Sequence, residues 1–272
     1  MRQAAHEVVE AVAGEVLQSR RYRWLAPDLV RRLAQRELTG ARTREEAVKR
    51  TKRRLHQVCG AYVWELRPEA ALASLQAARA QGDETAWRDA CRAVLAGHAS
   101  TRERLPVLDE FYQAIFRHTG RPRTLIDLAC GLGPLAFPWM GLPQDTTYLA
   151  YDVDRRLVEL VDGGLTLSGV PHVAELRDVV SRPPSATAEV AFLLKSLTTL
   201  EQQAPGSARR VIDALNVPSV VVSFPTRSLG GAGKGMVTHY RRHLSHLLAG
   251  SDWAVTELLF PPELVFILAR PG

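Results

Sequence analysis

The sequence predicts a doubly wound α/β domain preceded by a smaller domain built only of helices. Up to about residue 118, apolar residues recur every three or four positions, as on amphipathic helices. From Arg121-Pro122 onward, short apolar runs alternate with helical segments, which is typical of a parallel sheet covered on both faces. The chain has 272 residues, 46% of them apolar, and is long enough to bury a full core in this arrangement.

The N-terminal helices have recognisable ends. Pro27 suits the first turn of the second helix, because its missing N–H costs nothing there, and Gly40 suits the end of that helix. Further helices are expected over 68–80, 84–97 and 105–118. We divide the chain into a helical domain, 1–104, and an α/β domain, 105–272.

The strands of the α/β domain are expected at six apolar runs, which are 124–130, 147–153, 189–195, 219–224, 253–260 and 263–269. Helices at about 155–167, 206–214 and 235–249 fall between some of them. Pro261-Pro262 joins the last two runs, which are close enough to pair as an antiparallel hairpin at the edge of the sheet.

Two classes of protein are excluded by composition. The three cysteines, Cys59, Cys91 and Cys130, form no CxxC pair, which argues against a disulfide scaffold or a Cys-rich zinc site. The first twenty residues lack the continuous apolar core of a signal peptide, and no apolar stretch approaches the roughly 18 residues that span a bilayer. We therefore expect a cytoplasmic protein rather than a secreted or membrane-spanning one.

Positive charge is concentrated near the N-terminus. Residues 20–54 hold thirteen Lys and Arg against four acidic residues, a net charge of +9 in a chain whose total is +6. Such a patch is expected of a protein that binds a phosphate backbone, although a solvated helix face would carry the same charges. Lys49/Arg53 and Arg50/Arg54 are spaced by four, so one helix displays these cations along adjacent rows.

A glycine-rich turn follows the first expected strand, with the sequence Asp127-Leu-Ala-Cys-Gly131-Leu-Gly133-Pro134. Its small residues let the backbone turn sharply and approach a ligand closely. The next strand ends in Asp152, where a carboxylate can accept hydrogen bonds from both hydroxyls of a ribose. The turn alone is equally typical of an ordinary loop, but the two features together predict a site for a nucleoside cofactor.

Two prolines argue against a dinucleotide as that cofactor. Pro134 and Pro138 interrupt the segment in which a dinucleotide-binding fold would begin the helix that holds the pyrophosphate. The DxxxGxG spacing, Asp152, a polar Asp178 after a third candidate strand and the terminal hairpin match methyltransferases that use S-adenosylmethionine. This inference rests on a family pattern, because a fold alone does not establish a function.

Six segments carry a more specific resemblance. They are KRTKRRLHQVCGAY (49–62), HASTRERLPVLDEFY (98–112), DLACGLGPLAFPWMGLP (127–143), AYDVD (150–154), LLKSLTTLEQQ (193–203) and SFPTRSLGGAGKGM (223–236). From about residue 20 to its end, the chain resembles the aminoglycoside-resistance 16S ribosomal RNA methyltransferases that modify N7 of guanine 1405. The resemblance implies that a Rossmann-like class I methyltransferase sheet follows the helical domain in the chain.

The resemblance also implies a set of cofactor-binding residues. They are Tyr62, His98, Ala99, Ser100, Arg104, Ala129, Gly131, Asp152, Asp178, Val179, Leu194 and Gln203. In this set Arg104 pairs with the methionine carboxylate, Asp152 binds the ribose, and Asp178 with Val179 holds the adenine. The chain departs from the family pattern at Gly133, which replaces Asn, at Thr198-Thr199, which replaces Pro-Cys, and at Tyr62, which replaces Phe.

Several of these residues also have simpler explanations. Arg104 suits a surface ion pair with Glu103 or Asp109, and His98 suits a histidine packed near the domain junction. Lys195, which follows four apolar residues, suits a solvated lysine at the rim of the sheet. Cys130 is expected to be a small buried filler rather than a nucleophile.

N7 of guanine has a free lone pair, so the implied reaction needs no general base and depends on positioning. Lys195 is the candidate catalytic residue, orienting the target guanine or stabilising the transition state. The candidate RNA-binding residues are Arg20, Arg21, Lys49, Arg50, Lys52, Arg53, Arg54 and Lys234, and Arg23, Arg31 and Arg32 extend the same surface.

Contacts with phosphates depend on the shape of the RNA and do not distinguish a guanine from another base. We therefore expect the substrate to be the assembled 30S subunit, and we expect the protein to act as a monomer. Methylation should give resistance to 4,6-disubstituted deoxystreptamine aminoglycosides. Two alternatives stay open: a methyltransferase for a small metabolite, and an RNA-binding or ribosome-assembly factor that keeps the fold with little turnover. A methyltransferase acting at the neighbouring adenine fits the quoted segments less well.

Overall fold

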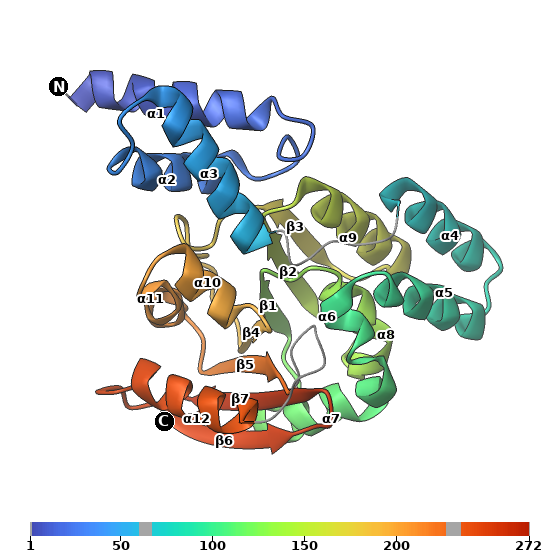
Figure 1. The fold of residues 1–272 in the computed structure, drawn as a ribbon. Helices are drawn as coiled ribbons and strands as arrows, with labels where there is room; N and C mark the ends of the chain where they lie inside the picture. The colour runs from blue at the N-terminus through green and yellow to red at the C-terminus, as the bar shows by residue number, and fades with distance from the viewer. Residues whose placement is uncertain (1, 60–66, 227–234, 272) are drawn as a thin grey trace.

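The helices at the N-terminal end form a small unit of their own. The computed structural model describes residues 2–59, 67–226 and 235–271. Helices α1 (Arg2–Leu17), α2 (Pro27–Leu38) and α3 (Arg44–Cys59) lie together at one end of the molecule, above the sheet (Figure 1). Their apolar faces meet in a cluster that includes Val12, Leu33 and Leu55, all fully buried. Helix α2 begins at Pro27 as expected and ends at Leu38, close to Gly40.

The next helices pack differently. Helices α4 (Pro68–Ala80) and α5 (Glu84–Ala96) have the bounds that the sequence predicts to within a residue, and the short α6 (Ala99–Arg102) follows them. Figure 1 shows α4 and α5 beside α9 (Arg155–Ser168), away from α1–α3. Leu75 and Trp87 belong to the same buried cluster as Tyr148 of the sheet. Packing therefore divides the chain between α3 and α4, whereas the expected boundary lies at 104/105.

A seven-stranded sheet forms the centre of the remaining chain. Its strands are β1 (Thr124–Leu128), β2 (Thr147–Asp152), β3 (His172–Leu176), β4 (Val190–Leu194), β5 (Ser219–Pro225), β6 (Ala254–Leu259) and β7 (Glu263–Ala269). The spatial order is β3-β2-β1-β4-β5-β7-β6, with β1–β5 parallel and β7 antiparallel to both of its neighbours. The predicted fold class and the predicted hairpin at the edge are confirmed.

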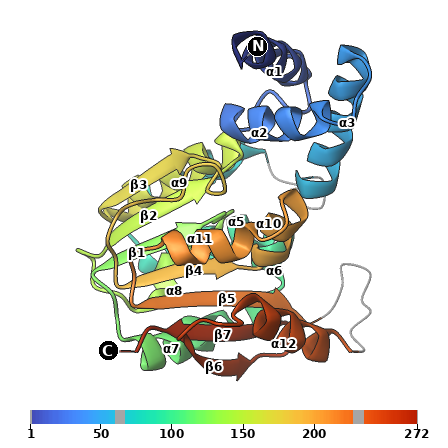
Figure 2. The same ribbon diagram turned by 90° about the vertical axis from the view of Figure 1, so that its left-hand side faces the viewer.

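Helices cover both faces of the sheet, and Figure 2 looks onto one of these faces, with helices in front of the strands and behind them. One face packs against α4, α5, α7 (Leu108–Thr119), α8 (Phe137–Met140) and α9. The other packs against α10 (Leu197–Gln203), α11 (Ser207–Ala214) and α12 (Met236–Leu247). Because alternate strand residues point to opposite faces, Leu125 belongs to the first cluster and Ile126 to the second. The strands are therefore apolar throughout.

Two helical details differ from the expected elements, and one expectation is confirmed. The helix expected over 105–118 begins with a 3₁₀ turn, Leu105–Val107, before α7, and α10 was not expected. After the glycine-rich turn the chain forms a 3₁₀ turn, Gly133–Ala136, and the four-residue α8, so the interrupting effect expected of Pro134 and Pro138 is confirmed. No helix among the described residues is long and apolar enough to cross a membrane.

Candidate active site

A pocket opens at the carboxyl ends of the parallel strands. The strand order reverses between β1 and β4, and ligands of open α/β sheets bind outside the sheet at such a switch point. Residues that follow four strands line this pocket: Ala129 and Gly131 after β1, Asp152 at the end of β2, Asp178 and Val179 after β3, and Leu194 and Lys195 at β4. His98, Ser100, Arg104 and Gln203 also form part of its wall.

The structure thus brings most of the expected cofactor residues together. Ten of the twelve line the pocket. Ala99 is the first residue of α6, next to the lining residues but not among them. Tyr62 lies outside the described residues, as does Lys234. Leu25 and Val58, from the α1–α3 unit, also line the pocket and were not expected there.

The glycine-rich turn passes close under the pocket. Ala129 and Gly131 adopt left-handed backbone conformations, with φ of 51° and 53°. A Cβ atom at Gly131 would lie 3.4 Å from Cε1 of His98, and one at Gly133 would lie 3.1 Å from Oδ2 of Asp127. Glycine at both positions therefore lets the turn run close against these two side chains.

Asp152 joins the glycine-rich turn to the end of β2. Its Oδ2 accepts a hydrogen bond from the Gly131 N–H (2.9 Å), and Oδ1 accepts from the N–H groups of Val153 (2.7 Å) and Asp154 (3.0 Å). Burial raises the pKa of Asp152 to about 6, against the opposing effect of these three donors. The carboxyl group is held rigidly at the pocket, where an acceptor for ribose hydroxyls is expected.

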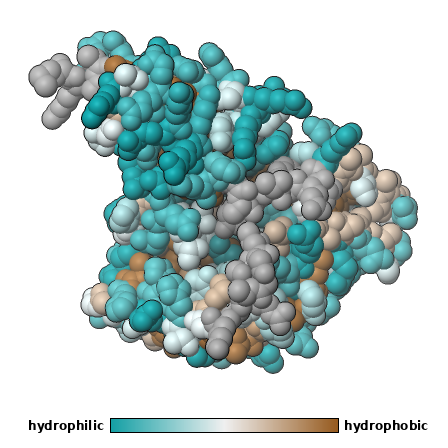
Figure 3. All heavy atoms as spheres, viewed as in Figure 1, coloured by the Kyte–Doolittle hydropathy of each residue, from teal (hydrophilic) through white to brown (hydrophobic). Residues whose placement is uncertain are grey.

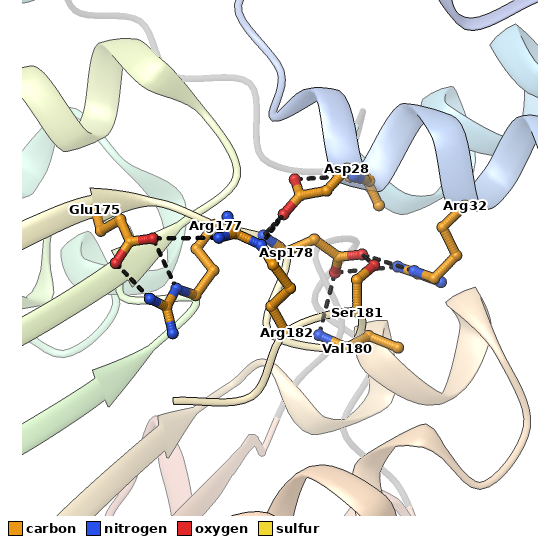
Figure 4. Close-up of polar contacts among 9 residues, drawn as sticks. Asp28, Arg32, Glu175, Arg177, Asp178, Val180, Ser181 and Arg182 are labelled. Carbon is orange, nitrogen blue, oxygen red and sulfur yellow. Dashed lines mark hydrogen bonds and ion pairs between the residues drawn. The ribbon is translucent and has the colours of Figure 1, made fainter. Parts of the chain in front are cut away.

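Asp178 is bound by an arginine from the N-terminal unit. Arg32 of α2 donates from Nε to Oδ2 (2.6 Å) and from Nη2 to Oδ1 (3.1 Å), and its Nη2 also donates to Oε1 of Gln203. Figure 4 shows Arg32 reaching Asp178 from α2, while Asp28 of the same helix faces Arg182. The expectation that Arg32 extends the RNA-binding surface stays a prediction, but its guanidinium is bound to Asp178 and Gln203 within the protein.

A second charged group lies at the ends of β4 and β7. Arg104 donates from Nε to Oε2 of Glu263 (2.9 Å) and from Nη2 to Oε1 (2.7 Å). Both side chains are buried, at 3% and 0% exposure. The prediction that Arg104 forms a surface ion pair with Glu103 or Asp109 is therefore wrong. Two of its three guanidinium nitrogens bind Glu263, and its pairing with a methionine carboxylate stays a prediction.

Lys195 belongs to this same group. Its Nζ lies 2.7 Å from Oε2 of Glu103, 3.2 Å from the carbonyl oxygen of Ser100 and 3.5 Å from Oε2 of Glu263. Lys195 is 7% exposed and has a φ of 57°, so it is not a solvated lysine at the rim. Burial favours the neutral form of Glu263, but the charges of Arg104 and Lys195 lower its pKa below the usual value.

Glu263 is the residue of this site that sequence reasoning missed. The only signal is an acidic residue at the first position of an otherwise apolar strand, ELVFILA. The Oγ of Ser223 on β5 also donates to Glu263. Together with the charges of Arg104 and Lys195, this bond lets a carboxylate be buried at this position.

His98 is buried at the junction between α5 and α6. Its Nδ1 lies 2.9 Å from Oγ of Ser100. Burial, helped by the charge of Arg102, lowers the pKa of His98 to about 4, so the ring is neutral at physiological pH. Burial likewise raises the pKa of Cys130 well above its usual value, as expected of a filler rather than a nucleophile.

The basic residues of α3 divide into two sets. Lys49 and Arg53 are exposed, whereas Arg50 and Arg54 donate from Nε to the buried carboxylate of Glu37 on α2 at 3.2 and 3.3 Å. Lys52 is half-buried, and Arg20 and Arg21 are exposed. Figure 3 shows hydrophilic residues over the face of α1–α3 that this view presents. The four cations share one helix as expected, but one row also holds α3 against α2.

The arrangement suits a ligand with a nucleoside end and a charged end. The acids Asp152 and Asp178 lie at one side of the pocket, and the cations Arg104 and Lys195 lie at the other. Among residues 2–59, 67–226 and 235–271, no group of three or more His, Cys, Asp or Glu side chains is placed to hold a metal ion.

Comparisons with known proteins agree on one family. The model described as "Ribosomal RNA methyltransferase (FmrO)" matches residues 18–267. A protein of Micromonospora echinospora named 16S rRNA (guanine(1405)-N(7))-methyltransferase is 43% identical over 98% of both chains. A protein of Frankia casuarinae with the same name is 46% identical over 97% of this chain and 94% of its own.

Solved structures give the same result. The chain is similar to the 16S rRNA methyltransferase RmtF, whose crystal structure is a complex with S-adenosyl-L-homocysteine. The TM-score is 0.81 with 34% sequence identity, and the match covers 97% of this chain and 99% of RmtF. The 16S rRNA methylase RmtB matches with a TM-score of 0.79 and 29% identity over 97% of this chain and 98% of that one.

Proposed function

This chain belongs to the ribosomal RNA methyltransferase (FmrO) family, and on that premise we propose that it methylates N7 of guanine 1405 in 16S ribosomal RNA, with S-adenosylmethionine as the methyl donor. The observation that carries the proposal is the pocket at the carboxyl ends of β1, β2 and β4. Ten of the cofactor residues that the family resemblance implies line it. The relatives named above carry the name of this activity, which argues against a factor without turnover.

The residues of the pocket fit S-adenosylmethionine. The carboxyl group of Asp152 stands at the end of β2 as an acceptor for ribose hydroxyls. Leu25, Val179 and Leu194 provide apolar surface for a purine ring, and the left-handed turn at Ala129 and Gly131 leaves room beside the backbone. When bound, S-adenosylmethionine supplies an electrophilic methyl group on a sulfonium ion.

The protein's own contribution is orientation. Because N7 of guanine keeps a free lone pair, no residue has to remove a proton before methyl transfer. We propose that Lys195 orients the target guanine, since its ammonium group is held at the end of β4 by Glu103 and the Ser100 carbonyl. N7 lies in the narrow major groove of an RNA helix, so the guanine has to leave its stacked position to reach this group.

The α1–α3 unit is the proposed docking surface for the RNA. The proposed contacts are the exposed Lys49 and Arg53 on α3 and the exposed Arg20 and Arg21 on the segment between α1 and α2. Phosphate contacts of this kind fix position without reading bases, so we propose that shape selects the substrate and that it is the assembled 30S subunit. In this proposal the protein acts as a monomer in the cytoplasm.

Substitutions on α3 should separate the two sets of cations. Lys49→Ala and Arg53→Ala should each raise the KM for 30S subunits severalfold and reduce the slope of log affinity against log salt by about 1, because each removes one phosphate contact. Arg54→Ala should also lower the melting temperature, because Glu37 is buried and loses a partner. Methylation rates at several salt concentrations and thermal melts measure both effects. An unchanged KM and salt slope for Lys49→Ala would contradict the proposed surface.

Expression in a susceptible bacterium tests the activity in cells. Methylation of guanine 1405 adds a methyl group and a positive charge to the decoding site. The minimal inhibitory concentrations of gentamicin and kanamycin should therefore rise strongly, and that of neomycin should stay nearly unchanged. A Lys195→Met variant expressed to the same level is the control, and it should give little protection. Unchanged gentamicin sensitivity with confirmed expression of the wild type would count against the proposal.

A further inference from the structure

One guanidinium group connects the N-terminal unit with two separate parts of the pocket wall. Arg32 lies on the second turn of α2 and its side chain is 20% exposed. It binds both carboxylate oxygens of Asp178, which follows β3, and the side-chain oxygen of Gln203, which ends α10. Asp178 and Gln203 both line the pocket. Asp28 of the same unit binds Asp178 but not Gln203, and Arg36 binds Gln203 but not Asp178. Among the described residues of α1–α3, only the side chain of Arg32 binds both.

The carboxylate of Asp178 depends on this arginine for its charge balance. Its side chain is 2% exposed, and its remaining hydrogen bonds come from the neutral Oγ of Ser181 and the Val180 N–H. Figure 4 shows Arg32 reaching this carboxylate from α2, with Val180 below it. A buried carboxylate without its cation is strongly disfavoured, so loss of the arginine should displace the side chain. Arg32 thus helps to hold the Asp178 carboxylate in its position at the pocket.

Further contacts hold α2 at the pocket without touching the Asp178 carboxylate. Asp28 accepts from the backbone N–H of Asp178 (3.2 Å) and from Nε of Arg182 (3.0 Å). The segment before α2 also pairs with the loop after β2, where the Ala26 N–H donates to the carbonyl oxygen of Val153 (2.8 Å). These contacts attach the unit to the sheet domain, so Arg32 is not needed for attachment alone.

We propose that Arg32 is a positioning residue for the cofactor: it acts from α2 through Asp178 and Gln203 to shape the side of the pocket that takes the adenine ring. The inference rests on the proposed function, because it assumes that this pocket binds S-adenosylmethionine. In this proposal the affinity for the cofactor depends on a contact from the α1–α3 unit as well as on the residues of the sheet domain. It also removes Arg32 from the surface that contacts RNA.

Titration calorimetry of the full chain with S-adenosylhomocysteine, in the absence of RNA, tests the inference. Arg32→Ala should raise the Kd about tenfold or more, which corresponds to the loss of one charge-assisted hydrogen bond. Arg32→Lys, which keeps the charge without the two-pronged geometry, should recover part of the affinity. Neither substitution should change the KM for 30S subunits when the cofactor is saturating.

Two control variants separate this effect from a general loosening. Arg182→Ala removes the ion pair between Asp28 of α2 and Arg182 of the loop after β3. Arg31→Ala removes the ion pair between Arg31 of α2 and Glu10 of α1. Both should keep the wild-type Kd within about twofold, since a lost surface ion pair is worth little. If Arg32→Ala does not fold, the Arg32→Lys comparison with these controls carries the test.

Two results would overturn the inference itself, and a third would overturn the proposed function on which it rests. An unchanged Kd in Arg32→Ala with a raised KM for 30S subunits would make Arg32 an RNA-binding residue. An equal loss of affinity in Arg182→Ala would make the effect a property of the whole interface. Absence of S-adenosylhomocysteine binding to the wild-type protein would instead overturn the proposed function, from which this inference starts.

Discussion

Replacing Lys195 with methionine is expected to lower kcat for methyl transfer by about a hundredfold, the usual cost of removing one positioned charged group from an active site. Methionine keeps much of the buried aliphatic stem, so the change removes mainly the ammonium group. That group lies at the end of β4 between Glu103, the Ser100 carbonyl and Glu263. Single-turnover methylation of 30S subunits with saturating cofactor measures the effect.

The pattern of the kinetic constants distinguishes orientation of the guanine from a structural role. The Kd for S-adenosylhomocysteine should stay within about threefold of the wild type, because the proposed partner of Lys195 is the RNA base. A structural role would lower the cofactor affinity and the melting temperature together, since Glu263 is fully buried and would lose a cation. A Lys195→Met variant with the wild-type rate would remove Lys195 from the mechanism.

Replacing Asp152 with alanine is expected to raise the Kd for S-adenosylhomocysteine by about a hundredfold or more. Hydrogen bonds from the two ribose hydroxyls to a charged acceptor contribute roughly 1.5–3 kcal/mol each, and every 1.4 kcal/mol is about tenfold in affinity. The change also leaves the N–H groups of Gly131, Val153 and Asp154 without their acceptor, which loosens the glycine-rich turn. Calorimetry measures the loss, and an affinity within threefold of the wild type would contradict the assignment.

Glu175→Ala is the matched control for Asp152→Ala. Glu175 lies on β3 and pairs with Arg177 through both carboxylate oxygens, but it does not line the pocket. Its replacement removes an acid near the same edge of the sheet and should leave the cofactor affinity unchanged. A loss similar to that of Asp152→Ala would show that the affinity depends on general charge and not on the ribose contact.

The same carboxyl group gives the cofactor affinity a pH dependence. The pKa of Asp152 is raised to about 6 by burial, so the group is ionised at pH 8 and takes up a proton as the pH falls through 6. A neutral acid is the weaker acceptor, and the affinity should therefore be constant above pH 7 and fall below pH 6.

Two variants assign this pH dependence to Asp152. Asp152→Asn should remove it. Asp127→Asn should retain it, although burial raises the pKa of Asp127 to about 7 and this residue also lines the pocket. A pH dependence that survives in Asp152→Asn would assign the titration to another group.

Sequence patterns predict the sheet and the glycine-rich turn well because both are local. The bounds of β1, β2, β4 and β7 follow apolar runs, and Asp152 is the last residue of β2. Because β1 pairs with β2 in parallel, the carboxyl ends of both strands lie at one edge of the sheet. The glycine-rich turn and Asp152 therefore lie next to each other. Periodicity and strand order therefore suffice for the ribose side of the pocket.

Partners from distant parts of the chain could not be predicted in the same way. Arg104 and Glu263 are 159 positions apart, and Arg32 and Asp178 are 146 apart. Each pair forms only when distant parts of the chain have folded together, and nothing local distinguishes Arg32 from the exposed Arg31 beside it. Charge counting therefore placed Arg32 on the RNA-binding surface, and it treated Arg50 and Arg54 as free cations although both bind Glu37.

Transfer of labelled methyl from S-adenosylmethionine to purified 30S subunits, with free 16S RNA in parallel, tests the central claim most directly. Borohydride–aniline treatment, which cuts RNA at N7-methylguanine, locates the modified base. We expect label in the 30S subunit, a single cut at guanine 1405 and little label in free RNA. No transfer to either RNA by a protein that still binds S-adenosylhomocysteine, or a cut at another base, would contradict it.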